Sequence, residues 1–358
     1  MKLLHTSDIH IDSPLNTRLP SEKVRERKRE LLLSFSQLRS EAKRLGACGI
    51  IIAGDLFDSE KISKKALDTA IDVISSSPEL AYFYLCGNHE KGALRDSGVS
   101  LPENLYVFGE EWTYFEIGDT IIAGRSRCEE NMFDSLRVVP GKKNITVLHG
   151  ELRDGASAPE VIGRREAAGR GIDYIALGHY HSYREEKLDR QTSAVYCGTP
   201  EGRGFDEVGK KGFVLIDTEG EGIRHSFISF AKRRLHAITV DISGVTRISE
   251  LNARAEAALI GVPSSDLVRL VLVGARTPDF LYDCDTLERG LERGYYYLEV
   301  KDESGLEINP EDYKNDKSLK GEFIRMVSSD ASLSERDKEK IISVGLHALM
   351  GEEYYTEG

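Results

Sequence analysis

Short, continuous apolar segments recur through the first half of the 358-residue chain and alternate with helical patterns. The segments comprise residues 49–54, 81–87, 120–124, 145–150 and 173–179, followed by AVYCG and GFVLIDT. Continuous apolar runs of this length are typical of strands that are buried on both faces of a sheet. Between them, residues 21–45 and 63–75 place apolar side chains at helical steps of three and four, the second behind a cap at Ser63. The alternation predicts an α/β fold.

The pattern changes at AKRRLH, residues 231–236. Beyond it, the strand-like segments HAITVDI, LVRLVLVG and YYYLEV and a helical pattern at 248–260 predict a smaller α+β domain. A last helix over 332–350 begins with a capping-box candidate, Ser332 and Glu335. We therefore expect a first domain over 1–232, a second over 233–315 and a C-terminal helical segment over 316–358.

Composition narrows the class of protein. No apolar run approaches the roughly 20 residues that span a bilayer, and MKLLHTSDIH becomes polar too early for a signal peptide. The five cysteines are scattered, and none forms a CxxC pair. We therefore expect a cytoplasmic protein without a membrane segment or a thiolate metal site.

Polar residues follow directly after five of the expected strands. They are Asp8 and His10, GDLFD at 54–58, GNHE at 87–90, His149, and GHYH at 178–181. Each of these motifs alone can be explained without a functional role, as a polar strand end, a turn or a helix cap. The carboxyl ends of strands share one sheet edge, however, and five loops would have to place nitrogen and oxygen ligands there by accident. Together they predict a metal site without thiolates.

This ordered set of motifs resembles the calcineurin-like metallophosphoesterases and covers residues 1 to about 205. HTSDIHIDSPL, GDLFD and YCGTPEGRGFDEVGKKGFVLID are more similar to the DNA-repair exonuclease branch, of the bacterial SbcD type. The resemblance implies a four-layer α/β/β/α sandwich with a smaller α+β capping domain.

The resemblance also implies a site for two divalent metal ions. One metal would be held by Asp8, His10, Asp55 and His181, and the other by Asp55, Asn88, His149 and His179, with Asp55 bridging. His89 would stay off the metals, near the substrate, and Asp58 would orient that region. Glu90 departs from the family pattern, which more often has Asp there, and Asp12 has no ligand role.

The charges of this ligand set favour a phosphodiester substrate. Two dications bring a charge of about +4 and the two carboxylates about −2, which leaves a surplus of about +2 for hydroxide and a phosphodiester anion. A hard metal such as manganese (Mn²⁺) suits oxygen and imidazole ligands. His89 could then donate a proton to the leaving oxygen.

The charges agree with a two-metal phosphodiesterase, and the resemblance implies that it acts on DNA with an SbcC-like coiled-coil ATPase and forms a homodimer. The net charge of −12 argues against a polyanionic partner, although residues 21–44, 163–170 and 231–234 are locally basic. Two alternatives stay open: a phosphodiesterase of small esters or cyclic nucleotides, and a scaffold for the ATPase with a purely structural metal site. For the C-terminal segment we expect an apolar stripe, which either packs against the second domain or docks the ATPase; its residues are Phe323, Ile324, Ile341 and Leu349.

Overall fold

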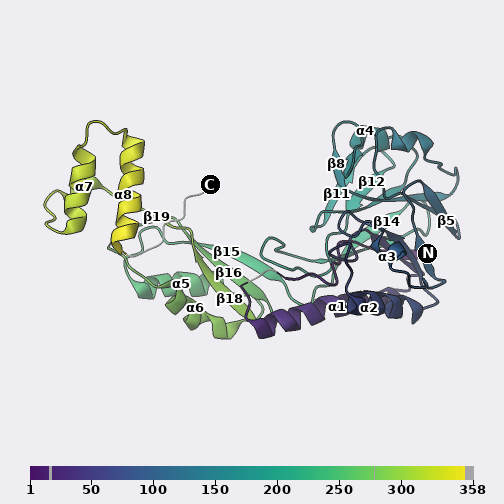
Figure 1. The fold of residues 1–358 in the computed structure, drawn as a ribbon, viewed down its shortest axis with the longest axis horizontal. Coiled ribbons are helices and arrows are strands. Elements are labelled where there is room, and N and C mark those ends of the chain that lie inside the picture. The colour runs from purple at the N-terminus through teal and green to yellow at the C-terminus, as the bar shows by residue number, and fades with distance from the viewer. Residues whose placement is uncertain (16–17, 278, 351–358) are drawn as a thin grey trace. The chain divides into compact units, whose positions relative to one another are not determined.

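A computed structural model describes residues 1–15, 18–277 and 279–350 (Figure 1). The chain divides into two compact units, Met1–Leu235 and His236–Gly358. Within the described residues, no helix is both long and apolar enough to cross a membrane.

Two six-stranded mixed sheets form the first unit. The first sheet has the order β14-β13-β1-β2-β3-β4 and the second β11-β12-β10-β7-β6-β5. The strands of the first sheet are β1 (Lys2–Thr6), β2 (Gly49–Ala53), β3 (Ala81–Leu85), β4 (Leu105–Val107), β13 (Gly212–Asp217) and β14 (Arg224–Ser229). Those of the second are β5 (Thr113–Ile117), β6 (Thr120–Gly124), β7 (Lys143–His149), β10 (Tyr174–Gly178), β11 (Arg184–Lys187) and β12 (Ser193–Tyr196).

Each apolar segment predicted from the sequence forms one of these strands. In β2, Ile50 and Ile52 pack toward the helices, whereas Ile51 and Ala53 pack toward the second sheet. The strand is apolar throughout because both of its faces are covered. The predicted α/β fold is therefore confirmed.

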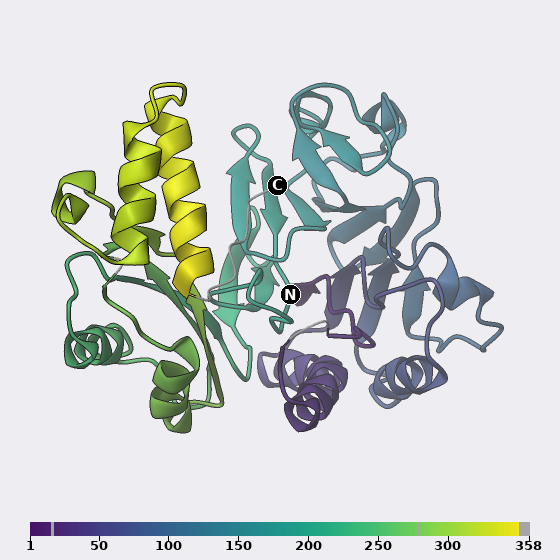
Figure 2. The same ribbon diagram turned by 60° about the vertical axis from the view of Figure 1, so that its left-hand side comes forward.

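The outer faces of the two sheets are covered differently. Helices α1 (Ser21–Arg44) and α2 (Lys64–Ser75) lie side by side against the first sheet (Figures 1 and 2). Ser63 caps α2 as predicted, because its hydroxyl accepts the Ala66 N–H at 3.2 Å. Short elements cover the second sheet: η1 (Met132–Ser135), β8 (Glu151–Arg153), β9 (Val161–Gly163) and α4 (Arg164–Ala167). The unit also contains α3 (Ala93–Asp96).

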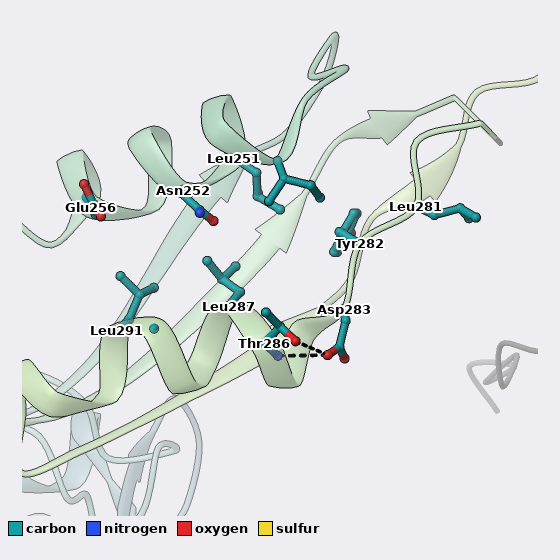
Figure 3. A pocket seen from close by; sticks show the side chains of 11 residues that line it. Leu251, Asn252, Glu256, Leu281, Tyr282, Asp283, Thr286, Leu287 and Leu291 are labelled. Atoms are coloured by element: carbon teal, nitrogen blue, oxygen red, sulfur yellow. Dashed lines mark hydrogen bonds between the residues drawn. The ribbon is translucent and has the colours of Figure 1, made fainter.

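The second unit has a three-stranded sheet with the order β15-β16-β18. Its sheet strands are β15 (Leu235–Asp241), β16 (Leu267–Val273) and β18 (Tyr297–Asp302), packed against α5 (Ile248–Ala258) and α6 (Cys284–Leu291). Between α5 and α6 lies a cavity of about 550 Å³, which Leu251, Leu287 and Leu291 line with apolar atoms (Figure 3). The remaining elements are η2 (Glu292–Gly294), the paired β17 (Ala275–Arg276) and β19 (Gly305–Leu306), η3 (Pro310–Tyr313), α7 (Leu319–Ser329) and α8 (Glu335–Met350).

Helices α7 and α8 pack as a hairpin with its own small core (Figure 2). The predicted cap at Ser332 is wrong, because the Ser332 hydroxyl binds Asp330 at 2.6 Å. Ser334 accepts the Asp337 N–H at 3.2 Å instead, which starts the helix two residues later. Ile324, which we expected in an exposed stripe, is buried between the two helices.

Candidate metal centre

The predicted site residues lie at the carboxyl ends of five strands, in both sheets. Asp8, Asp55 and Asn88 follow β1, β2 and β3 of the first sheet, while His149 ends β7 and His179 follows β10 of the second. The parallel pairing of β1 with β2, β2 with β3 and β7 with β10 puts these ends at the same edge of each sheet. The packing of the two sheets on each other then brings the two edges together.

Two groups of potential ligands share Asp8. Asp8, His10 and His181 form one, and Asp8, Asp55 and His149 form the other, with all ligand atoms of each group within 4.8 Å of one another. Asp55 faces both groups, because its Oδ2 lies 3.9 Å from His10 Nε2 and 3.4 Å from His149 Nε2. A carboxylate in this position can contact two metals at once.

Asn88 and His179 complete the set on the His149 side. Asn88 Oδ1 lies 2.8 Å from His149 Nε2, and the His149 and His179 rings are 5.4 Å apart in an edge-on arrangement. The backbone N–H of His179 donates to both oxygens of Asp8 at 3.1 Å. All seven residues predicted as metal ligands thus converge on one place.

Three imidazoles direct the same nitrogen into this place. Nδ1 of His10 contacts Asp58 Oδ1 at 2.9 Å, Nδ1 of His181 contacts Glu207 Oε1 at 2.7 Å, and Nδ1 of His149 donates to the carbonyl of Ala53 at 2.9 Å. An oxygen beside Nδ1 favours a proton on that nitrogen, so that Nε2 is the nitrogen available as a ligand. Histidines that bind metals in proteins are oriented in this way.

The burial of this group fits a bound cation. Asp8, Asp55 and His10 are buried, and among the described residues neither ring nitrogen of His10 makes a hydrogen bond, although Nδ1 lies 2.9 Å from Asp58 Oδ1. Burial opposes the charge of Asp55, but the hydrogen bond and charge of His149 outweigh it and lower the pKa of Asp55 to about 2. Asp55 in turn raises the pKa of His149 to about 9 against the effect of burial. Buried carboxylates are stable only when paired, and a divalent metal among them fits both the charges and the ligand types.

The backbone at the site is strained. Asp8, His10, Asp55 and His179 have positive φ angles of 50°, 46°, 52° and 102°. A residue other than glycine in this region costs about 1–3 kcal/mol, and such residues cluster at functional sites. Close approach adds a further constraint: a Cβ on Gly87 would lie 2.0 Å from Asp55 Oδ1. The loops therefore adopt backbone conformations that are unfavourable in themselves but that place these side chains at the site.

His89 and Asp58 lie next to His10 and form with it a third group of potential ligands, which contains neither Asp8 nor Asp55. His89 is exposed, its ring is 5.1 Å from that of His10, and its Nδ1 donates to the Asp58 carbonyl at 3.2 Å. The carboxylate of Asp58 contacts His10, so Asp58 orients both histidines. Asp12 accepts the Asp58 N–H at 2.9 Å and thereby fixes the loop after β2.

Glu90 binds backbone rather than metal. Its fully buried carboxylate accepts N–H groups of Leu56, Phe57 and Gly87 at 3.1, 2.7 and 3.3 Å. Burial, together with the charge of Asp55, raises the pKa of Glu90 to about 7. The longer side chain thus joins the loop after β2 to the loop after β3.

We expect Glu90→Ala to lower the free energy of unfolding by about 3 kcal/mol, because it leaves three buried N–H groups without an acceptor. Urea unfolding of the metal-free protein measures this. Glu60→Ala, at an exposed position, is the matched control and should unfold like the parent protein. Equal stability of the two variants would contradict this role of Glu90.

Sequence reasoning missed three charged residues in the segment between β12 and β13. Arg203 contacts Asp58 and Glu207, Glu207 contacts His181, and the buried Lys211 donates to the His181 carbonyl. In the sequence, the segment stands out only as part of YCGTPEGRGFDEVGKKGFVLID. Its one local signal is Arg203 four residues before Glu207 in a glycine-rich stretch.

A cavity of about 610 Å³ adjoins the site on the side of Asn88 and His149. Its apolar wall includes Tyr84, Leu94 and Phe108. Three cations and three anions also line it: Lys91, Arg95, Arg127, Asp96, Glu110 and Glu160.

The model of the family described as calcineurin-like phosphoesterase matches residues 1–183, just over half of the chain. The chain belongs to this family. Its phosphoesterases use divalent metal ions, in agreement with the groups of Asp and His described above.

Among curated relatives, the "Uncharacterized metallophosphoesterase YhaO" of Bacillus subtilis is 26% identical over 320 residues, which is 82% of this chain and 76% of that protein. The "DNA double-strand break repair protein Mre11" of Sulfurisphaera tokodaii is 24% identical over 372 residues, or 96% and 92% of the two chains. The D component of the nuclease SbcCD of Staphylococcus epidermidis is 26% identical over 262 residues, or 61% and 66%.

Proposed function

We propose that this member of the calcineurin-like phosphoesterases is a two-metal phosphodiesterase that hydrolyses DNA, as the nuclease component of a cytoplasmic DNA-repair complex. The observation that supports it most is that seven side chains with nitrogen or oxygen ligand atoms lie close together, with the exposed His89 beside them. A purely structural metal site has no use for that additional imidazole.

We assign the metal ligands as Asp8, His10, Asp55 and His181 for one ion and Asp55, Asn88, His149 and His179 for the other. When bound, two divalent ions, which we take to be manganese, supply positive charge for the phosphoryl oxygens and activate water. His89 holds its Nδ1 proton on the Asp58 carbonyl, which leaves Nε2 to meet the substrate. When His89 is protonated, its Nε2 carries a second proton, which it can donate to the leaving oxygen.

The cavity beside Asn88 and His149 supports a nucleotide substrate. Its apolar wall suits a base, and Lys91, Arg95 and Arg127 can meet phosphates. The basic clusters noted in the sequence contribute less, because many of their cations already have acidic partners: Arg27 contacts Glu201, Lys43 contacts Glu79 and Arg164 contacts Glu186.

Degradation of end-labelled DNA tests the proposal. The full-length protein with manganese should shorten duplex and hairpin DNA, and the same protein with EDTA or with His89→Ala should not. Hydrolysis of bis(p-nitrophenyl) phosphate without any DNA degradation would instead favour the small-ester alternative. A protein that binds metal and hydrolyses neither substrate would contradict both of these functions.

We further propose that the α7–α8 hairpin docks a coiled-coil ATPase of the SbcC kind. The names of two relatives refer to double-strand break repair and to an SbcCD nuclease. The hairpin exposes the apolar side chains Met326, Ile341 and Leu349, at 63%, 38% and 46% of their surfaces. Exposed apolar side chains of this kind often mark protein-binding surfaces.

Met326→Glu combined with Ile341→Glu should abolish co-purification with the ATPase, because charges would replace the apolar contacts. Pull-down of the co-expressed pair measures this, and unchanged ester hydrolysis shows that the nuclease domain is intact. The matched control is Ile260→Glu, an exposed apolar position after α5. Unaltered co-purification of the double variant would exclude this face as the docking site.

A further inference from the structure

Arg203 lies between two carboxylates in the segment that joins β12 to β13. Its Nη1 donates to Asp58 Oδ1 at 2.9 Å, and its Nε and Nη2 donate to Glu207 Oε1 at 3.0 and 2.8 Å. The Arg203 backbone N–H also donates to Glu207 Oε2 at 2.7 Å, and Nη2 lies 3.3 Å from His181 Nδ1. The fork of the guanidinium is therefore occupied by protein groups.

Each of these two carboxylates contacts the Nδ1 atom of one histidine. Asp58 contacts Nδ1 of His10 at 2.9 Å, and Glu207 contacts Nδ1 of His181 at 2.7 Å. His10 and His181 belong to the same ligand group, together with Asp8. One guanidinium thus links the supports of two imidazoles that point at the same spot.

The charges explain why a cation is needed at this point. Glu207 is buried, and its carboxylate contacts His181 at 2.7 Å and Arg203 at 2.8 Å. Asp58 is half-buried and contacts His10 and Arg203, each at 2.9 Å. Without Arg203, two neighbouring carboxylates would repel each other and lose the donors that fix their rotamers.

The other ligand group is supported by different atoms. His149 is oriented by the carbonyl of Ala53, and Asn88 Oδ1 contacts His149 Nε2 directly. Neither contact includes Asp58, Glu207 or Arg203. A change at Arg203 should therefore alter the metal affinity of one ligand group and not that of the other.

We propose that Arg203 is a positioning residue that sets the affinity of one of the two metals, the one held by Asp8, His10, Asp55 and His181. The proposal rests on the two-metal function proposed above. Arg203 acts through Asp58 and Glu207, which hold the protons of His10 and His181 on Nδ1 and keep both Nε2 atoms directed at the metal. Lys211 assists by holding the His181 carbonyl.

Calorimetric titration of the metal-free, full-length protein with Mn²⁺ tests this directly. The parent protein should bind two ions. Arg203→Ala should weaken one of the two binding steps by about 10- to 100-fold, the usual effect of losing a group that orients a ligand, and leave the other step within about threefold. Arg224→Ala is the matched control, since Arg224 pairs with Asp217 at 2.8 Å outside the site.

A second pair of variants separates positioning from folding. Arg203→Lys keeps the charge but cannot bind two carboxylates with one fork, so it should weaken the same step by less than Arg203→Ala does. Combining Arg203→Ala with Glu207→Gln should weaken the step by less than the product of the two separate effects, because the two variants share the path through His181. Thermal unfolding of the metal-free variants shows that they are folded.

The outcomes distinguish this inference from the proposed function. Equal weakening of both steps, or of neither, overturns the role of Arg203. A parent protein that binds two ions but degrades no DNA contradicts the substrate and leaves the role of Arg203 intact. A parent protein that binds a single ion contradicts the two-metal assignment, and Arg203 with it.

Discussion

Asp55→Asn is expected to abolish hydrolysis of DNA and of small phosphodiesters and to reduce the bound manganese from two ions to at most one. Asp55 Oδ2 faces a histidine nitrogen on each side, His10 at 3.9 Å and His149 at 3.4 Å. Asparagine keeps the shape but removes the charge and turns one oxygen into a donor, which cannot bind a cation. The expected loss of activity is at least about a thousandfold, since the charge that favours the transition state is lost with the metal.

Asp55→Asn also has a matched control within the same loop. Asp58→Asn removes a carboxylate three residues away that touches His10, which belongs to only one of the two ligand groups that share Asp8. It should keep one metal bound with near-normal affinity, whereas Asp55→Asn should disturb both. Metal content after dialysis and calorimetry measure the difference. Two tightly bound ions in Asp55→Asn would refute the bridging position.

His89→Ala should lower the rate of hydrolysis by at least about a hundredfold and leave both metals in place. His89 is exposed, and its ring contacts His10 only edge-on, while its Nδ1 is held by a carbonyl. The variant therefore loses a proton donor without losing a metal ligand.

The leaving group provides the sharpest test of this role. A p-nitrophenolate leaves without protonation, whereas a sugar oxygen needs a proton, so the loss in His89→Ala should be much smaller for p-nitrophenyl esters than for DNA. His89→Gln, which keeps a hydrogen-bonding group but cannot titrate, should resemble alanine on DNA. Full activity on DNA, or loss of manganese in His89→Ala, would disprove the assignment.

Much of the site could be predicted from the sequence because it obeys the geometry of parallel sheets. The predicted ligands Asp8, Asp55, Asn88, His149 and His179 each lie at the end of a strand, and strand ends meet wherever strands run in parallel. The residues that orient these ligands through direct contacts could not be predicted in this way. Glu207 and Arg203 come from an irregular loop, whose path is decided by contacts between groups that are 145 residues apart in sequence, such as Arg203 with Asp58.

Contacts that only the folded chain reveals explain the smaller errors of the sequence-based prediction. Ser332 and Ser334 both suit a helix cap, and only the capture of Ser332 by Asp330 decides between them. Ile324 fits an exposed stripe until α8 folds back over it. The role of Glu90 depends on one additional methylene, whose reach is visible only when the two loops are in place.

The proposed ligands come from two separate sheets. Metal binding should therefore affect how readily these two sheets separate. A bound ion would work as a cross-link between β1, β2 and β3 on one side and β7 and β10 on the other. Separating the sheets would then require release of the ions, so that opening becomes slower and rarer as manganese rises. Because both proposed ions take ligands from both sheets, amide exchange in β7 and β10 should slow by up to about a hundredfold for each tenfold rise in free metal above saturation, while exchange in α7 and α8 stays constant.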